Sequence, residues 1–318
     1  AHDNYPADVK DLFVFQRTAS WCVPRMDQPT PNSIREKILD DGGKSTLRVE
    51  EWKNIETFYQ LINEESSNKV VRDGIAQGIR AIIKDPKVAD LLIPKIVFFA
   101  KRPLVMDNYY QSFNKDNVHL ISDPGGVVKA TETGLQTADG RHIDVDVIVS
   151  AAGFDAGRPT IEKIYGRKGI ELNKSVGFTG HPKTDILAPH TVLGIHIPEF
   201  PNLYVMIGAQ ALNPVTNINI MCKRQSEHIA EAICRCESEG AIVEVSHESA
   251  DEWTKICHKS SLDRVWSKAN NYYNKNGTLP LSASYWGTVA TYFDYLNEWK
   301  KNLHFNVAKN HQKNRSKL

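Results

Sequence analysis

Leu12-Phe-Val-Phe-Gln-Arg-Thr18 is the stretch of sequence that decides the fold class. Its four apolar residues, Leu12–Phe15, predict a strand covered on both faces, as strands are in a parallel sheet. Arg17 and Thr18 follow the strand at once. In dinucleotide-binding sheets this position grips the adenosine 2'-phosphate of NADPH, because a guanidinium fork matches phosphate oxygens. The stretch by itself also fits a solvated surface arginine, so the surrounding sequence has to decide.

The residues on either side predict an α/β protein. Apolar residues recur at helical spacing between Thr30 and Ile93, which predicts a helical insertion. Short strand-like runs begin near Asn117, and they predict a small antiparallel sheet, with a turn at Asp139-Gly140, that leads into a buried strand. These runs are Val118–Ile121, Val127–Ala130, Gly134–Thr137 and Val145–Ser150.

The C-terminal third predicts one more strand and three helices. The strand is expected at Leu203–Ile207, where an apolar run ends at a glycine. The helices are expected over 217–238, 249–259 and 286–299, because their apolar residues recur on one face. Ser249 or Asp251 is expected near the N-terminal cap of the second helix.

The composition excludes several classes of function. The chain has 318 residues, 41% of them hydrophobic and 24% charged, which is typical of a globular fold. A net charge of +1 gives no electrostatic reason to expect a nucleic-acid partner. The longest apolar runs, such as Leu91–Ala100, fall short of the ~20 residues of a membrane helix, so no membrane span is expected. His196 and His228 have no carboxylate or cysteine at ligand spacing, so no metal site is expected.

The last three residues, Ser316, Lys317 and Leu318, form the tripeptide that the peroxisomal import receptor reads at a free C-terminus. Residues 309–318 are predicted to be a flexible basic tail that leaves the tripeptide accessible. A chance ending and a cloning remnant are the alternatives. The sequence therefore predicts a peroxisomal location, and a cytoplasmic one if the tripeptide is not read.

Several longer stretches give the first strand and its arginine a context. They are Phe15-Gln-Arg-Thr-Ala-Ser-Trp-Cys-Val-Pro24, Lys101-Arg102-Pro103, Asp107-Asn-Tyr-Tyr-Gln-Ser-Phe-Asn-Lys-Asp-Asn-Val-His-Leu120, Asp144-Val-Asp-Val-Ile-Val-Ser-Ala-Ala-Gly-Phe-Asp155, Thr191-Val-Leu-Gly194 and Phe200-Pro-Asn-Leu203. In this order and at this spacing they closely resemble Baeyer–Villiger monooxygenases, flavoproteins that insert oxygen next to a ketone carbonyl. The resemblance runs from about Leu12 to Tyr292.

The resemblance implies a partial form of that family's fold, which combines two dinucleotide-binding domains with a helical insertion. Residues 1–24 would end the NADPH-binding domain, 25–95 would form the helical insertion, and 96–115 would return to the NADPH domain with the Lys-Arg-Pro loop. Residues 116–308 would form the C-terminal part of the FAD-binding domain, before the tail 309–318. FAD and NADPH are the implied cofactors, and a ketone or aldehyde is the implied substrate.

The resemblance also implies roles for the cationic residues. Arg17 and Thr18 match the contacts to the 2'-phosphate, and Lys101 matches their positively charged partner from a neighbouring loop. Arg102 is the implied catalytic residue, since its counterpart sits over the flavin and stabilises negative charge that develops on oxygen. A plain salt bridge is the alternative role for Arg102.

Other matched positions imply contacts to the flavin. Ala152, Gly153, Gly208 and Gln210 match backbone that approaches it, where a glycine lets backbone amides come close. The sequence departs from the family here, because Ala152 replaces the usual threonine and no proline follows Gly208. These departures favour a weakened flavin site.

Two tryptophans are candidates for a substrate pocket. Trp266 and Trp286 are large enough to line one, and packing in a core is the alternative for both.

The glycine-rich turns that bind dinucleotides are missing from the sequence. No Gly-x-Gly-x-x-Gly occurs in the 318 residues, and about a dozen residues precede Phe15, fewer than the roughly 30 of one strand-helix-strand unit. We therefore expect the C-terminal portion of a monooxygenase, which is either part of a longer chain or assembles with a separate N-terminal half or as a homo-oligomer. Two alternatives stay open: a flavin-independent cyclase, isomerase or dehydratase of natural-product biosynthesis derived from this fold, and a non-catalytic binding protein.

Overall fold

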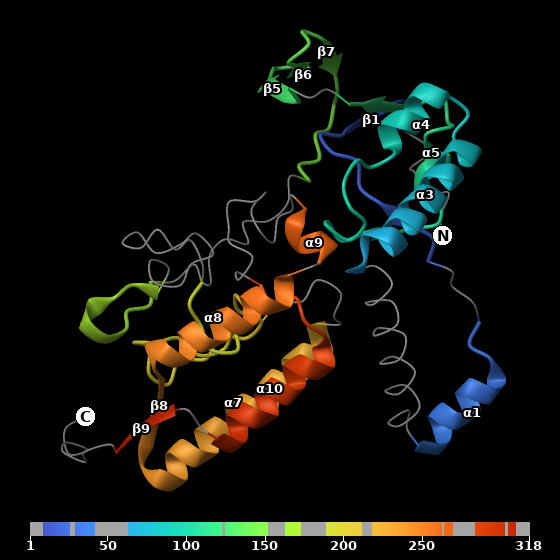
Figure 1. Ribbon diagram of the computed structural model, residues 1–318. Helices are drawn as coiled ribbons and strands as arrows, with labels where there is room; N and C mark the ends of the chain where they lie inside the picture. The colour runs from blue at the N-terminus through green and yellow to red at the C-terminus, as the bar shows by residue number, and fades with distance from the viewer. Residues whose placement is uncertain are drawn as a thin grey trace. The chain divides into compact units, whose positions relative to one another are not determined.

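The chain divides into two compact units. The computed structural model describes residues 9–25, 29–41, 63–122, 125–151, 163–172, 189–211, 218–262, 264–269, 284–302 and 305–309. One unit comprises Ala1–Thr46 and Glu65–Gly153, and the other comprises Leu47–Glu64 and Phe154–Leu318. Both mix helices with short strands, as Figure 1 shows, which confirms the predicted α/β class. None of the described helices is long and apolar enough to cross a membrane.

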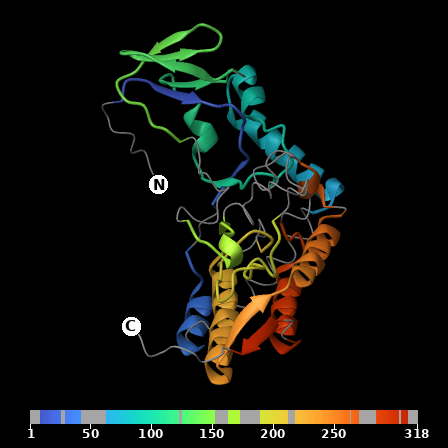
Figure 2. The same cartoon turned by 90° about the vertical axis from the view of Figure 1, so that its left-hand side faces the viewer.

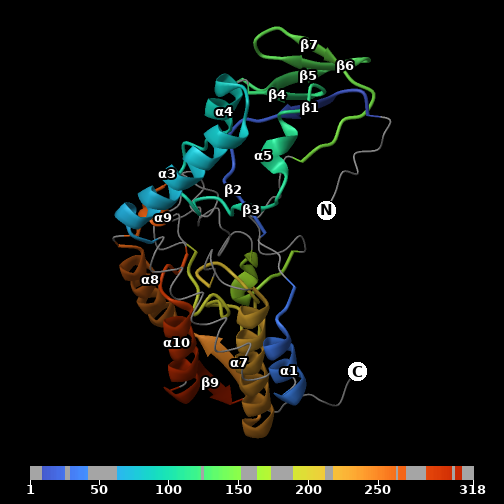
Figure 3. The ribbon, with the colours of Figure 1, turned by 90° about the vertical axis from the view of Figure 1, so that its right-hand side faces the viewer.

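The first unit is built on a pair of parallel strands. β1 (Leu12–Phe15) lies beside β4 (Val118–Ile121), with Leu12 opposite Val118. The apolar side chains of α3 (Glu65–Ile82), α4 (Pro86–Leu92) and α5 (Tyr109–Ser112) pack against this pair (Figure 3). The predicted first strand is therefore confirmed.

The described part of the predicted insertion is helical, as expected. It comprises α1 (Asn32–Asp41), α3 and α4. Asp85 caps α4, since its side chain accepts a hydrogen bond from the backbone N–H of Lys87 at 2.8 Å. The helix α4 therefore begins directly after Asp85, with Pro86 in its first turn.

Two more small sheets belong to the first unit. β2 (Cys22–Val23) pairs in parallel with β3 (Leu104–Val105). β5 (Val127–Ala130), β6 (Gly134–Thr137) and β7 (His142–Asp144) form an antiparallel sheet, the green arrows in Figure 2. The predicted turn at Asp139-Gly140 joins β6 to β7, and its glycine has a φ of 87°.

Two strand predictions are wrong, and a third predicted strand forms but lies in a different sheet. Val118–Ile121 pairs in parallel with β1 and does not belong to the antiparallel sheet, because alternation along one strand does not identify its partner. Val145–Ser150 forms no strand and is exposed, with Val147 76% and Val149 83% accessible. Leu203–Ile207 also forms no strand and is mostly half-buried. An apolar run indicates that a segment tends to be buried. It does not identify the strand that pairs with the segment, because that strand lies elsewhere in the chain.

The second unit is centred on three helices. α7 (Ile218–Glu239), α8 (His247–Ser261) and α10 (Val289–Asn302) share one apolar core with the loop around Leu193 (Figure 1). The apolar face of α10, with Val289, Phe293 and Leu296, is buried in that core. The three predicted helices are confirmed.

The remaining elements of the second unit are short. β8 (Ala241–Val245) pairs in antiparallel fashion with β9 (Phe305–Lys309), the orange and red arrows in Figure 2. α9 (Val265–Lys268) follows α8, and a 3-10 turn spans Arg167–Gly169. α8 is capped by Ser246, whose hydroxyl accepts from the N–H of Ser249 at 3.1 Å, so the cap lies three residues before the predicted Ser249.

Candidate functional site

The first unit carries the candidate cationic side chains on two segments. Arg17 and Thr18 follow the end of β1 and are exposed, and Lys101 and Arg102 lie in the loop before β3, where Lys101 is half-buried and Arg102 is exposed. Among the residues that the structure describes, none of these three cations has a carboxylate in ion-pair contact. The positive charge of this group is therefore not neutralised by that part of the protein.

The positive charge of Arg17 acts on the ammonium group of Lys101. Burial, and after it the positive charge of Arg17, lowers the pKa of Lys101 from its ordinary value of 10.5. Two like charges raise each other's energy unless an anion lies between them. Arg17 and Lys101, which lie far apart in the sequence, are therefore close enough in the fold for the charge of one to act on the other.

Gly208 and Gln210 lie in the second unit, in the loop before α7. A side chain at Gly208 would clash with the carbonyl oxygen of Gly194, so close backbone packing requires a glycine here. The Gln210 side chain is fully buried, and its Oε1 accepts hydrogen bonds from the backbone N–H of Thr191 at 2.9 Å and from its hydroxyl at 2.8 Å. Its Nε2 donates to the hydroxyl of Thr254 at 3.0 Å. These bonds direct the side chain of Gln210 into the interior of the second unit.

A buried hydrogen-bond chain that the sequence analysis missed fixes the same loop. The Tyr292 hydroxyl donates to the carbonyl oxygen of Leu193 at 2.7 Å and accepts from Gln225 Nε2 at 2.8 Å. Gln225 Oε1 accepts from the backbone N–H of Ile207 at 2.8 Å. Burial raises the pKa of Tyr292, and although the hydrogen bond with Gln225 lowers it, the hydroxyl stays protonated. In the sequence, Gln225 and Tyr292 lie on the otherwise apolar faces of α7 and α10, and this was the signal for these hydrogen bonds.

Backbone strain is concentrated in this loop. Leu193, Glu199, Asn202, Ile207 and Gln210 all have positive φ between 52° and 69°. Such conformations cost a non-glycine residue about 1 kcal/mol or more and persist only where the surroundings hold them. The hydrogen bonds to Gln225, Tyr292 and Thr191 provide that hold.

Trp266 and Trp286 lie together and are both fully buried. Their ring centroids are 6.5 Å apart with the planes tilted by 49°. A shallow surface depression of about 570 Å³ lies over β5–β7, and none of the candidate residues lines it.

Several candidate residues fall outside the described residues. They are Ala152, Gly153, Ser316, Lys317 and Leu318. Among the described residues, no group of three histidine, cysteine or acidic side chains could hold a metal ion.

The chain is similar to known monooxygenases along most of its length. It is 32% identical to a Baeyer–Villiger monooxygenase of Pseudooceanicola batsensis over 83% of this chain and 53% of that protein. It is 34% identical to ketocytochalasin monooxygenase of Aspergillus clavatus over 85% of this chain and 48% of that protein. The chain thus spans about half the length of the curated relatives that it matches. No family model matches the sequence.

Solved structures of the same kind share the fold. An oxidised steroid monooxygenase bound to NADP superposes with a TM-score of 0.75 at 25% identity, covering 95% of this chain and 63% of that one. Cyclohexanone monooxygenase from Rhodococcus sp. Phi1, bound to NADP+, gives a TM-score of 0.79 at 24% identity over the same shares of the two chains. The second likeness shows the fold alone.

Proposed function

The chain is homologous to Baeyer–Villiger monooxygenases, and on that premise we propose that it carries part of the cofactor and reaction site of such an enzyme. The proposed reaction inserts an oxygen atom next to the carbonyl of a ketone or aldehyde, using NADPH and O2. The observation that carries the proposal is that, among the described residues, no carboxylate pairs with Arg17, Lys101 or Arg102, while the charge of Arg17 acts on Lys101. A fixed group of positive charges is costly to maintain unless an anion binds it.

Arg17, Thr18 and Lys101 would hold the 2'-phosphate of NADPH. A guanidinium, a hydroxyl and an ammonium offer donors that match the oxygens of one phosphate. FAD and NADPH, when bound, supply the electrons and the oxygen-activating ring. Arginine keeps its charge at any physiological pH, so Arg102 would stabilise negative charge that develops on oxygen.

The backbone of Gly208 and Gln210, with Ala152 and Gly153, would approach the flavin. The hydrogen bonds from Gln225, Tyr292 and Thr191 support this, because they hold the loop rigid whether or not a cofactor is present. The rest of the cofactor contacts would come from the half of the relatives' length that this chain does not span. A separate N-terminal half, or a second copy of the chain, is the proposed source.

Replacing Arg102 with alanine tests the catalytic proposal. We expect Arg102→Ala to lose oxygenation by about a hundredfold or more, while the affinity for NADPH stays the same, because the charge acts on the reaction and not on the 2'-phosphate. Product formation and NADPH binding are the two measurements. Arg80→Ala is the control, since Arg80 is an exposed arginine of the same unit paired with Asp90 at 3.1 Å. Unchanged product formation in Arg102→Ala would remove the role.

A flavin-independent enzyme is the second candidate function. It is favoured by Ala152 in place of the family's threonine and by the inward bonding of the Gln210 side chain. The colour of the purified protein separates the two candidates. A yellow protein that oxidises NADPH in the presence of a ketone supports the monooxygenase, whereas a colourless protein that converts a substrate without NADPH supports the flavin-independent enzyme.

The tripeptide Ser316-Lys317-Leu318 supports a peroxisomal location and a contact with the import receptor. This part of the proposal rests on the sequence of the tail.

A further inference from the structure

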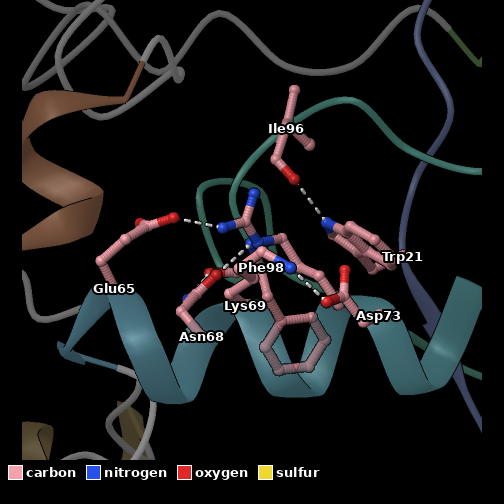
Figure 4. Close-up of polar contacts among 8 residues, drawn as sticks. Trp21, Glu65, Asn68, Lys69, Asp73, Ile96 and Phe98 are labelled. Atoms are coloured by element: carbon pink, nitrogen blue, oxygen red, sulfur yellow. Dashed lines mark hydrogen bonds and ion pairs between the residues drawn. The ribbon is translucent and has the colours of Figure 1, made fainter.

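The loop that carries Lys101 and Arg102 is held by an asparagine from α3. Asn68 is fully buried, and its side-chain amide meets the backbone of Phe98 on both sides (Figure 4). Nδ2 donates to the carbonyl oxygen of Phe98 at 3.1 Å, and Oδ1 accepts from the N–H of Phe98 at 3.2 Å. The amide therefore binds Phe98 as a neighbouring strand would, with one donor and one acceptor.

Trp21 holds the same loop at both ends. Its indole Nε1 donates to the carbonyl oxygen of Ile96 at 2.9 Å, and its own carbonyl oxygen accepts from the N–H of Leu104 at 2.8 Å. Its ring lies edge-on to that of Phe98 with the centroids 6.1 Å apart. Trp21 also stands four residues after Arg17 on one continuous segment, so it ties the two sources of positive charge together.

The backbone between Phe98 and Lys101 has little freedom. The N–H of Ala100 donates to the carbonyl oxygen of Val97 at 3.0 Å, and Ala100 is fully buried. Phe99 adopts a φ of 69°, a conformation that only a tight turn imposes on a large residue. Fixing Phe98 therefore fixes Lys101.

The charged neighbours of Asn68 on α3 serve a different purpose. Lys69 pairs with Asp73 at 2.5 Å, and Arg72 pairs with Glu65 (Figure 4). These pairs join residues of the same helix, whereas the Asn68 side chain reaches the loop.

We propose that Asn68, with Trp21, is a positioning residue that sets the place of Lys101 and Arg102 relative to Arg17. The inference rests on the proposed function, and it adds residues that touch neither cofactor nor substrate. Like charges repel, so the cations need a frame that holds them together before the phosphate arrives. A frame built in advance raises affinity because less order has to be created on binding.

The test uses Asn68→Leu and a matched control. Asn68→Leu keeps the side-chain size and removes both bonds to Phe98. Asn114→Leu is the control, because Asn114 forms the same kind of bridge in the same unit: its Nδ2 donates to the carbonyl oxygen of Ile82 at 2.8 Å, and its Oδ1 accepts from the N–H of Lys84 at 2.9 Å. Trp21→Phe keeps an aromatic ring, although a smaller one, and removes the bond to Ile96, so it tests the frame independently if Asn68→Leu does not fold.

The first readout is selectivity for the phosphate. Affinities of the full chain for adenosine 2',5'-bisphosphate and adenosine 5'-monophosphate are measured by calorimetry, and their ratio reports the contacts to the 2'-phosphate alone. We expect Asn68→Leu and Trp21→Phe to lower the ratio by about tenfold, the effect of one charge-assisted contact, and Asn114→Leu to leave it unchanged. A loss of folded protein would weaken both ligands alike and leave the ratio the same.

The second readout does not depend on any nucleotide. The pH dependence of Lys101 acetylation, followed by mass spectrometry, gives the pKa of its amine. We expect this pKa to rise toward its ordinary value in Asn68→Leu and Trp21→Phe, because Lys101 moves away from Arg17 and out of its half-buried place. It should stay low in the wild type and in Asn114→Leu.

The outcomes separate the inference from the proposed function. In one outcome, the wild type binds the two nucleotides equally while Asn68→Leu still changes the pKa of Lys101. That result would contradict the proposed NADPH site and support the positioning role of Asn68. A folded Asn68→Leu or Trp21→Phe with an unchanged Lys101 pKa would overturn the positioning role, whatever the wild type binds.

Discussion

Two buried histidines show how the chemistry of a residue depends on a partner distant in sequence. The Nε2 atoms of His196 and His228 are 2.8 Å apart, and the two rings meet edge to face, with 71° between their planes. A single hydrogen lies between two nitrogens in such a bond, so one ring donates and the other accepts. Burial, and then the charge of His228, lowers the pKa of His196 well below its ordinary value of 6.5. The sequence analysis treated both residues as structural, and their pairing makes them sensitive to pH.

The pair predicts a loss of stability in acid. A folded-state pKa below the unfolded one means that the unfolded chain binds the extra proton, so stability is complete above about pH 6.5 and falls as the pH drops toward the folded pKa. Over that window the free energy of unfolding should fall by about 1.4 kcal/mol per pH unit from this group.

Urea unfolding between about pH 8 and about pH 5 measures this effect. We expect His196→Gln to flatten the pH dependence, and His258→Gln, at an exposed position on α8, to leave it as in the wild type. Equal slopes in the wild type and in His196→Gln would contradict the assignment.

The structure of the segment Val145–Ala151 also depends on partners that are distant in the sequence. Val145, Val147 and Val149 alternate along one face and Ile148 lies between them, which is a pattern that favours a strand. Yet Val147, Ile148 and Val149 are 76%, 54% and 83% exposed. The recorded backbone bond here, from the N–H of Val145 to the carbonyl oxygen of Thr133, ties only the start of the segment to the β5–β7 sheet. We infer that this segment pairs with a sheet of another polypeptide, either the separate N-terminal half or a second copy of the chain.

Lysine substitutions in this segment should cost little stability. Val147→Lys and Val149→Lys replace exposed side chains, so we expect the free energy of unfolding to change by about 0.5 kcal/mol or less and the binding of a hydrophobic dye to fall. Ile143→Lys, at a buried position of β7, is the control that should destabilise by several times that amount. If the two valine variants unfold as readily as Ile143→Lys, the segment is buried in solution and the inference is wrong.

The whole molecule divides its candidate residues between two units. Arg17, Lys101 and Arg102 belong to the first unit, and Gly208, Gln210 and the two tryptophans belong to the second. Each unit holds its own residues with its own buried polar contacts, Asn68 and Trp21 in the first, Gln225 and Tyr292 in the second. Each unit therefore holds its own candidate residues through its own contacts.

Delivery in the cell is a property of the whole chain that the tail predicts. A Leu318→Asp variant places a charge where the import receptor reads a leucine, so we expect a fluorescently tagged chain to remain in the cytosol. The fluorescent protein is fused to the N-terminus, and Lys313→Asp, outside the tripeptide, is the control that should still be imported. Import of Leu318→Asp would remove the targeting proposal.

The sequence by itself determined the α/β class, the first strand, the helices α7, α8 and α10, and the family that the chain resembles. These follow from local periodicity and from motifs, which are written in neighbouring residues. Only the tertiary structure decided that β4 pairs with β1, that Val145–Ala151 stays uncovered, that Arg17 meets Lys101, and that Asn68 and Tyr292 hold the loops around the candidate residues. The physical reason is that strand pairing and burial join residues far apart in the chain. The local sequence of one segment fits many possible partners, so it does not identify the partner that the fold provides.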